Sequence, residues 1–192
     1  MIIEDDDVDL AARLLQRHAG LAMDEHGKDT PARFLHMLSE LTACAKENDL
    51  AANACMKFKA FPSNSDDMVI IRDIPFTSVC NHHLLPFTGL ANVGYVPNGK
   101  IVGLSKPARV VQHFARRPQV QERLTSDIAD YLEKALDPRG VAIVMSAEHQ
   151  CMTIRGVQAP GTFTTTSTMR GVFGEHTRTA KAEFLQMIGQ RR

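Results

Sequence analysis

The sequence has no excess of charge of either sign, since lysine plus arginine and aspartate plus glutamate each number 22. A balanced charge gives no global attraction for nucleic acid or an anionic membrane, so recognition of any anion must be local. No apolar run approaches the length of a membrane span. The acidic start, Met1–Asp7, lacks the basic and apolar regions of a signal peptide. These absences predict a soluble cytoplasmic protein with no nucleic-acid partner and no membrane partner.

Cysteine is also scarce, with only Cys44, Cys55, Cys80 and Cys151 in the chain. A disulfide scaffold would be denser in cysteine, shorter and secreted. Free cysteine is often buried, so we expect Cys44 and Cys55 to be packing residues. Cys80 and Cys151 instead lie in motifs that contain histidine.

The periodicity of the 192 residues indicates one domain with an N-terminal appendage. Helices are expected over residues 5–20, from Thr30, and over 105–116, 119–136 and 179–188. Strands are expected over 68–72, 76–79, 89–95, 100–102, 141–147, 153–157 and 162–169. Helices, strands, a helix pair and further strands in this order predict an α+β fold, with an antiparallel sheet and helices on one face. We place the N-terminal helical segment at residues 1–60 and the main domain at 61–192.

Two motifs, Cys80-Asn81-His82-His83 and His149-Gln150-Cys151, each follow a strand-like apolar run. A sheet can bring two strand ends together, and two thiolates with one imidazole suit a tetrahedral zinc ion. Three protein ligands leave one position open for water, as in catalytic zinc sites. A structural site would usually have a fourth protein ligand and a C-x-x-C knuckle. The motifs therefore predict a catalytic metal centre.

The histidines of these motifs leave an alternative open. Either His82 or His83 could bind the metal while its neighbour faces a substrate, because adjacent side chains point in different directions. A spacing of two also predicts that His149 and Cys151 lie on the same strand face. His149 would then be a second imidazole near the metal, suited to act as a general acid or base.

A second group of residues is basic and lies at an expected helix start. Ser105 precedes amides that attract anions, and Lys106 and Arg109 lie about one turn apart. Arg155 and Arg33 could add positive charge. In the next helix Glu122, beside Gln121, could accept hydrogen bonds from the edge of a purine.

Four stretches, in this order and spacing, closely resemble GTP cyclohydrolase I: C-N-H-H-L-L-P-F, G-L-S-K-P-A-R, R-P-Q-V-Q-E-R-L-T and H-Q-C-M-T-I-R-G. The resemblance runs from about Asp29 to the C-terminus. It implies the tunnelling fold (T-fold), an antiparallel sheet with two helices on one face, for residues 61–192. It also implies a homodecamer of two stacked pentamers, with active sites between subunits.

The resemblance assigns roles to matching residues. The zinc ligands would be Cys80, His83 and Cys151, and the proton-transfer groups would be His82 and His149. Glu122 would hold the guanine, with Gln121 nearby on the nucleotide. The triphosphate would be held by Ser105, Lys106, Arg109, Arg155 and Arg33.

The implied reaction is zinc-dependent hydrolysis of GTP. Activated water would attack C8 of the guanine while a histidine protonates the ring nitrogen, and the imidazole ring would open. A second hydrolysis would release formate. Rearrangement of the ribose would then give 7,8-dihydroneopterin triphosphate, the pterin precursor of folate-type cofactors.

Two residues depart from the family pattern. Asn81 stands where family members generally carry glutamate, and asparagine can neither take up a proton nor balance a cation. His36 stands where many relatives have lysine. These departures leave an alternative hypothesis open, in which the protein is a divergent paralogue that acts on another purine nucleotide or stops after ring opening. A non-enzymatic, metal-stabilised assembly is a third hypothesis, and it predicts unfolding when Cys151 is replaced.

Overall fold

The computed structural model describes residues 3–44, 59–174 and 178–190, and the chain divides into two compact units, Met1–Ala43 and Cys44–Arg192. Residues 45–58, which contain Cys55 and adjoin the domain boundary predicted at residue 60, lie outside the described residues. That boundary therefore stays a prediction. No helix in the described parts of the chain is long and apolar enough to cross a membrane.

The first unit is a pair of helices, α1 (Asp5–Ala19) and α2 (Thr30–Leu41), at the positions predicted from the sequence. Helix α1 begins with acidic residues and a capping box at Glu4, and it ends at Gly20, whose φ of 66° suits glycine. Pro31 lies in the first turn of α2, where its missing N–H has no consequence. Local signals thus define both helices.

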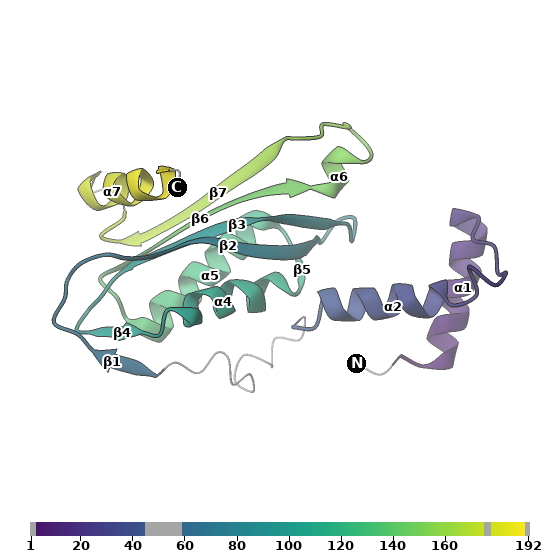
Figure 1. The fold of residues 1–192 in the computed structure, drawn as a ribbon, viewed down its shortest axis with the longest axis horizontal. Helices are drawn as coiled ribbons and strands as arrows, with labels where there is room; N and C mark the ends of the chain where they lie inside the picture. The colour runs from purple at the N-terminus through teal and green to yellow at the C-terminus, as the bar shows by residue number, and fades with distance from the viewer. Residues whose placement is uncertain (1–2, 45–58, 175–177, 191–192) are drawn as a thin grey trace. The chain divides into compact units, whose positions relative to one another are not determined.

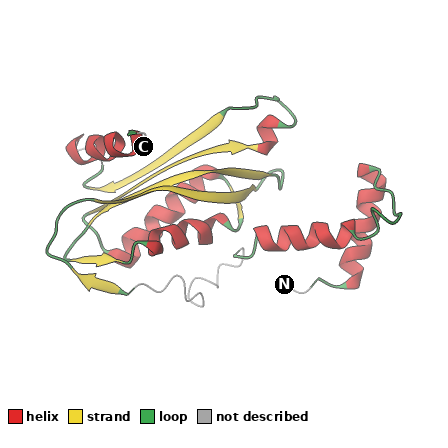
Figure 2. Cartoon of the chain, viewed as in Figure 1, coloured by secondary structure: helices red, strands yellow, loops and turns green. Residues whose placement is uncertain are grey.

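The second unit is built on a five-stranded sheet of order β5-β2-β3-β6-β7 (Figures 1 and 2). Its strands are β2 (Val69–Cys80), β3 (Pro86–Val96), β5 (Pro118–Gln119), β6 (Gly140–His149) and β7 (Phe163–Gly171). All neighbours are antiparallel except β5, which joins β2 in parallel through two residues. A separate two-stranded sheet pairs β1 (Ala60–Pro62) with β4 (Lys100–Val102).

Helices α4 (Ser105–Ala115) and α5 (Gln121–Leu136) cover one face of the large sheet, as Figure 1 shows. The main core lies between them and the strands, where Val141, Ile143 and Met145 of β6 meet Leu124 and Ile128 of α5. Alternate residues of a strand face opposite sides, so β6 sends every second side chain to this core. The predicted α+β fold with an antiparallel sheet and two helices on one face is confirmed.

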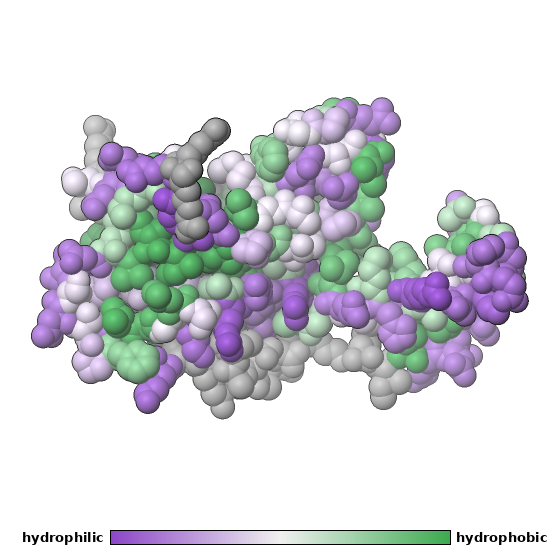
Figure 3. All heavy atoms as spheres, viewed as in Figure 1, coloured by the Kyte–Doolittle hydropathy of each residue, from purple (hydrophilic) through white to green (hydrophobic). Residues whose placement is uncertain are grey.

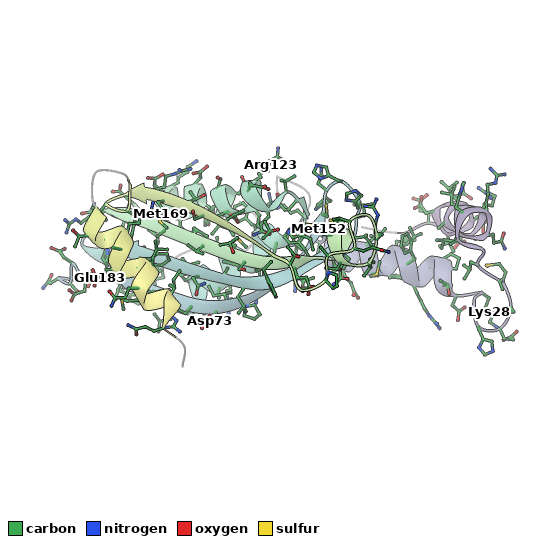
Figure 4. The ribbon with its side chains drawn as sticks, turned by 90° about the horizontal axis from the view of Figure 1, so that it is seen from above. Lys28, Asp73, Arg123, Met152, Met169 and Glu183 are labelled. Atoms are coloured by element: carbon green, nitrogen blue, oxygen red, sulfur yellow. The ribbon has the colours of Figure 1, made fainter. Side chains whose placement is uncertain are left out.

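Helix α7 (Arg178–Gly189) lies on the other face, where Phe184 packs with Ala142 and Val144 in a second core. Viewed from above, α7 with Glu183 crosses one end of the sheet, and Met152 lies at the other end (Figure 4). Apolar side chains gather beside α7 on the face drawn in Figure 3. The closing helix was predicted from the sequence, but its position on the opposite face was not.

Two strand predictions were wrong. Residues 153–157, rich in β-branched side chains, are not a strand, because α6 (Gln150–Thr153) and a turn follow β6 directly. The two strands predicted over 68–72 and 76–79 form one strand, β2, with an irregularity between Ile71 and Ile74. Asp73 takes a φ of 56° there, and its N–H donates to Asn92 Oδ1 at 3.1 Å, so the bulge continues the strand instead of ending it.

Replacing Gly94 with alanine should destabilise the docking of α7. A Cβ at Gly94 would lie 2.7 Å from Cε2 of Phe184, a fully buried ring. Overpacking of this kind costs about 1–3 kcal/mol. We therefore expect a lower unfolding midpoint in urea for Gly94→Ala.

Gly189→Ala is the matched control. Gly189 is the last residue of α7, and a Cβ there would meet nothing within 4 Å. It should leave the midpoint unchanged or raise it. Equal midpoints for wild type and Gly94→Ala would contradict the tight packing of Phe184 on β3.

Candidate active site

The sheet register brings the two histidine–cysteine motifs to the same end of the second unit. Strands β2 and β6 both run antiparallel to β3, which lies between them, so their C-terminal ends flank the start of β3. Val79 pairs with Pro86, and His149 pairs with Phe87. Residues nearly seventy positions apart therefore become neighbours through β3.

A tight turn after β2 returns His83 to Cys80. The N–H of Cys80 donates to Leu85 O at 2.8 Å, and the N–H of Leu84 donates to Cys80 O at 2.8 Å. Leu84 takes a φ of 52°, in the left-handed region that a leucine rarely occupies. Asn81 N–H donates to Gln119 O at 2.9 Å and holds the turn against β5. The turn brings Cys80 Sγ and His83 Nδ1 to 3.6 Å.

Cys80, His83 and Cys151 form a group that could hold a metal ion, because one ligand atom from each lies within 4.8 Å of the others. Bond lengths of about 2.3 Å to sulfur and 2.0–2.1 Å to nitrogen place two ligands of tetrahedral zinc about 3.6 Å apart. The distance between Cys80 Sγ and His83 Nδ1 fits this geometry. The donor set of two thiolates and one imidazole fits zinc as well.

Electrostatics couple the two cysteines. Burial and the neighbouring Cys80 raise the pKa of the Cys151 thiol, and the positive charge of Arg155 opposes this shift. A raised thiol pKa means that metal binding must displace a proton, so metal affinity falls as the pH falls. Arg155, predicted from the sequence as a source of positive charge, thus lies within electrostatic reach of the group.

His149 lies at the end of β6 with its ring fixed on two sides. The ring stacks on Phe87 at a centroid distance of 4.4 Å and an interplanar angle of 5°. Its Nε2 lies 2.7 Å from Oε1 of Gln121, the first residue of α5. Burial lowers the pKa of His149, and the carboxylate of Glu122 partly offsets this shift. Burial of the ring thus favours its neutral form.

His82 and Glu122, two further predicted site residues, are exposed near this end of the sheet. His82 lies in the turn after β2 with its ring edge-on to that of His83 at 6.1 Å. Glu122 lies in the first turn of α5, where its carboxylate is favoured by the helix dipole. Both side chains face solvent and have room for a ligand.

The structure does not bring the predicted anion-binding residues of α4 to this group within one chain. The C-terminal end of α4 leads into β5, whose Gln119 pairs with Cys80. Ser105 and Lys106 lie at the other end of this 11-residue helix, and Arg109 lies near its middle. A rise of 1.5 Å per residue makes α4 about 16 Å long. Arg33 belongs to the first unit and pairs with Asp29 at 3.1 Å.

One prediction about site geometry was wrong. His149 and Cys151 do not share a strand face, because β6 ends at His149 and Cys151 lies in α6. The short helix turns the chain so that Cys151 reaches Cys80. Sequence reasoning also missed the stacking of His149 on Phe87 and its bond to Gln121. No local sequence signal marks either contact, since both depend on strand register and helix packing.

Comparison with known proteins gives consistent matches over nearly the whole chain. A family model described as GTP cyclohydrolase I matches residues 10–189. "GTP cyclohydrolase 1" of Carboxydothermus hydrogenoformans is 44% identical over 190 residues, which cover 98% of this chain and 96% of that protein. "GTP cyclohydrolase 1" of Aquifex aeolicus is 44% identical over 189 residues, 98% of each chain. The protein of the same name from Methylococcus capsulatus is 53% identical over 131 residues, 68% of this chain and 70% of that protein.

Removing one of the three candidate ligands should abolish tight metal binding. Wild-type protein should hold about one zinc per chain after dialysis, and Cys151→Ala should hold almost none, since two ligands bind zinc far more weakly than three. Elemental analysis of the dialysed proteins measures this, with circular dichroism to check folding.

Cys44→Ala serves as the control, because Cys44 does not belong to the metal-ligand group. It should retain wild-type zinc. A folded, zinc-free Cys151→Ala protein would also argue against the hypothesis that the metal serves only to stabilise an assembly. Full zinc content in Cys151→Ala would disprove the proposed ligand set.

Proposed function

Because this chain belongs to the GTP cyclohydrolase I family, we propose that it is a zinc-dependent enzyme that hydrolyses GTP. The reaction opens the imidazole ring of guanine, releases formate and forms 7,8-dihydroneopterin triphosphate. The observation that carries the proposal is the group of Cys80, His83 and Cys151 at one end of the sheet, where β6 ends at His149.

The metal site is proposed to hold zinc through Cys80 Sγ, His83 Nδ1 and Cys151 Sγ. When bound, zinc supplies Lewis-acid activation of water for attack on the substrate. The turn at Leu84 and the helix α6 set the ligand positions before the metal binds. A ligand set built on strand ends is more rigid than one on a long loop, which favours a defined catalytic geometry.

The proton transfers are assigned to His82 and His149. Burial lowers the pKa of His149 and so favours the neutral ring, the form in which an imidazole can act as a general base. His82 is exposed in the turn beside the proposed metal ligands, so its ring is accessible to a bound base. Two imidazoles in different environments allow one group to donate while the other accepts.

Substrate binding is assigned to a carboxylate and a set of cations. Glu122 would accept hydrogen bonds from the guanine, and its exposed position at the start of α5 leaves it accessible. The triphosphate would be held by Ser105, Lys106, Arg109, Arg155 and Arg33. Fixed charges on the phosphates would orient the base over the metal group.

We assign the substrate site to an interface between copies of this chain. The distance along α4 that separates Ser105 from β5 argues that one copy supplies the metal group and another supplies the α4 cations. Among the described residues, β7 pairs on one side only, and β5 covers only Val79 and Cys80 of β2. Two open sheet edges favour a closed ring of subunits, in line with the decamer that the family resemblance implies.

A divergent activity is the second candidate, and Asn81 is the observation that favours it. The exposed Asn81 side chain lies between the ligand Cys80 and His82, where the family generally has glutamate. A neutral amide cannot relay a proton there. The enzyme would then act slowly on GTP, stop after ring opening, or prefer another purine nucleotide.

Incubation of the zinc-loaded enzyme with GTP should release formate and, after oxidation, give a fluorescent pterin. Removal of zinc by a chelator should abolish both products, and added zinc should restore them. Absence of both products from zinc-loaded protein would refute the cyclohydrolase assignment.

The same assay on Asn81→Glu separates the two candidates. A rate that rises about tenfold or more, or a switch from a formamide product to the pterin, would support the divergent activity. If the wild type and Asn81→Glu convert GTP completely and at the same rate, the case for a divergent activity is lost. Mass spectrometry of the products, with a panel of purine nucleotides, identifies the substrate and the last step reached.

The interface assignment predicts a large, closed assembly. Light scattering after size exclusion should give one species whose mass is a multiple of the chain, independent of dilution in the micromolar range. Arg109→Ala and Cys151→Ala proteins, each inactive alone, should regain part of their activity when mixed under conditions that exchange subunits. A monomer that turns over GTP at full rate would contradict the shared site.

A further inference from the structure

Gln121 is a polar side chain with almost no exposure to solvent, at 2%. Its Nε2 lies 3.0 Å from Thr164 O, 3.3 Å from Met145 O and 3.2 Å from Thr166 Oγ1. Its Oε1 lies 2.7 Å from His149 Nε2. The amide is therefore fully engaged between β6, β7 and His149.

The surroundings determine which end of the amide points to His149. Backbone carbonyl oxygens can only accept hydrogen bonds, so the NH₂ group must face Met145 O and Thr164 O. The reversed amide would place its oxygen against two carbonyl oxygens in a buried site, where the three acceptors would repel one another. Oε1 must consequently face the imidazole.

The hydroxyls of Thr125 and Thr166 support the same orientation. Thr125 Oγ1 donates its hydrogen to Gln121 O at 2.8 Å, so it can only accept from Thr166 Oγ1, which lies 2.6 Å away. Thr166 has then used its hydrogen, so its oxygen can only accept from Gln121 Nε2. The two hydrogens of Gln121 Nε2 are shared among three acceptors: Thr164 O, Met145 O and Thr166 Oγ1.

This orientation fixes the protonation pattern of His149. An amide oxygen accepts, so His149 Nε2 must carry a hydrogen. In the neutral ring Nδ1 then holds the lone pair. Stacking on the buried ring of Phe87 fixes the ring plane, and the bond to Gln121 fixes the rotation within that plane.

We infer that Gln121 is a positioning residue that holds His149 in its Nε2–H tautomer, so that Nδ1 is the atom that exchanges protons with the substrate. A proton taken up at Nδ1 forms a new N–H bond there, while the Nε2–H bond to Gln121 Oε1 persists. This role rests on the proposed function. It replaces a direct contact between the Gln121 side chain and the nucleotide, because such a contact would require the amide to leave its buried partners.

The tautomer can be measured without turnover. Nitrogen-15 NMR of histidine-labelled, zinc-loaded full-length protein distinguishes protonated from unprotonated ring nitrogens, and the His149 signals are those lost in His149→Asn. We expect the Nε2–H form in the wild type and a mixture of both tautomers in Gln121→Met, which has similar length and no amide. An Nδ1–H tautomer in the wild type would overturn the inference whether or not the protein acts on GTP.

Steady-state kinetics with GTP test the consequence for catalysis. Gln121→Met should lower kcat by about 10- to 100-fold, the usual effect of losing a supporting hydrogen bond, with KM within about twofold of the wild type. A raised KM with an unchanged kcat would show direct nucleotide binding and would overturn the inference. Gln112→Met, an exposed glutamine on α4, is the control and should behave as wild type.

Gln121→Glu keeps the test decisive if the methionine variant folds poorly. A protonated glutamate can donate to Thr164 O or Met145 O and keep its other oxygen against His149, so the Nε2–H tautomer should persist. A mixture of tautomers in the folded Gln121→Glu protein would overturn the inference. An inactive wild type with the expected Nε2–H signal would instead count against the proposed function alone.

Discussion

The antiparallel register of β2, β3 and β6 is the constraint on which the site depends. Because Val79 pairs with Pro86 and Phe87 pairs with His149, the ends of β2 and β6 lie on either side of the first two residues of β3. A slip of one residue in either pairing would turn His149 away from Phe87 and point Cys80 to the opposite face. The main core resists such a slip, since it would also expose Ile143 and Met145.

Two kinds of local structure then complete the geometry. The turn at Leu84 and the single helical turn of α6 are both short. They therefore leave the two thiols and the imidazole of His83 little conformational freedom. Below them, a buried network of amide and hydroxyl groups joins α5 to β7 and supports His149. Inside a protein such hydrogen bonds are stronger than at the surface, and an unsatisfied member would be costly. The backbone turn at Leu84 thus positions Cys80 and His83, and the buried polar network positions His149.

Much of the fold could be predicted from the sequence, because hydrophobic periodicity and capping residues act locally. Thr30-Pro31 and the apolar stripe of α5 defined helices within a few residues of their observed ends. The strand predicted over 153–157 failed because β-branched residues near Ile154 are also compatible with a turn. Hydrogen bonds from Ile154 N–H to Gln150 O and from Ala159 N–H to Met152 O hold that turn. The bulge at Asp73 could not be predicted from the local sequence either, because it depends on a hydrogen bond to Asn92 on the neighbouring strand.

Within the site, residue identity was easier to predict than residue geometry. The paired motifs at Cys80 and Cys151 indicated a metal group because few other functions need those ligand types together. The partner of His149 could not be inferred, because Gln121 reaches it only after α5 has packed on β6 and β7. Sequence spacing describes a chain in one dimension, and these contacts arise from the packing of whole elements.

The short strand β5 has a consequence for how the site responds to force. Gln119 accepts a hydrogen bond from Asn81, and two residues later Gln121 bonds to His149. One stretch of backbone between α4 and α5 is therefore tethered to both halves of the reactive centre. Any displacement of the two helices along the sheet would therefore shift the turn that carries Cys80 and the imidazole of His149 together.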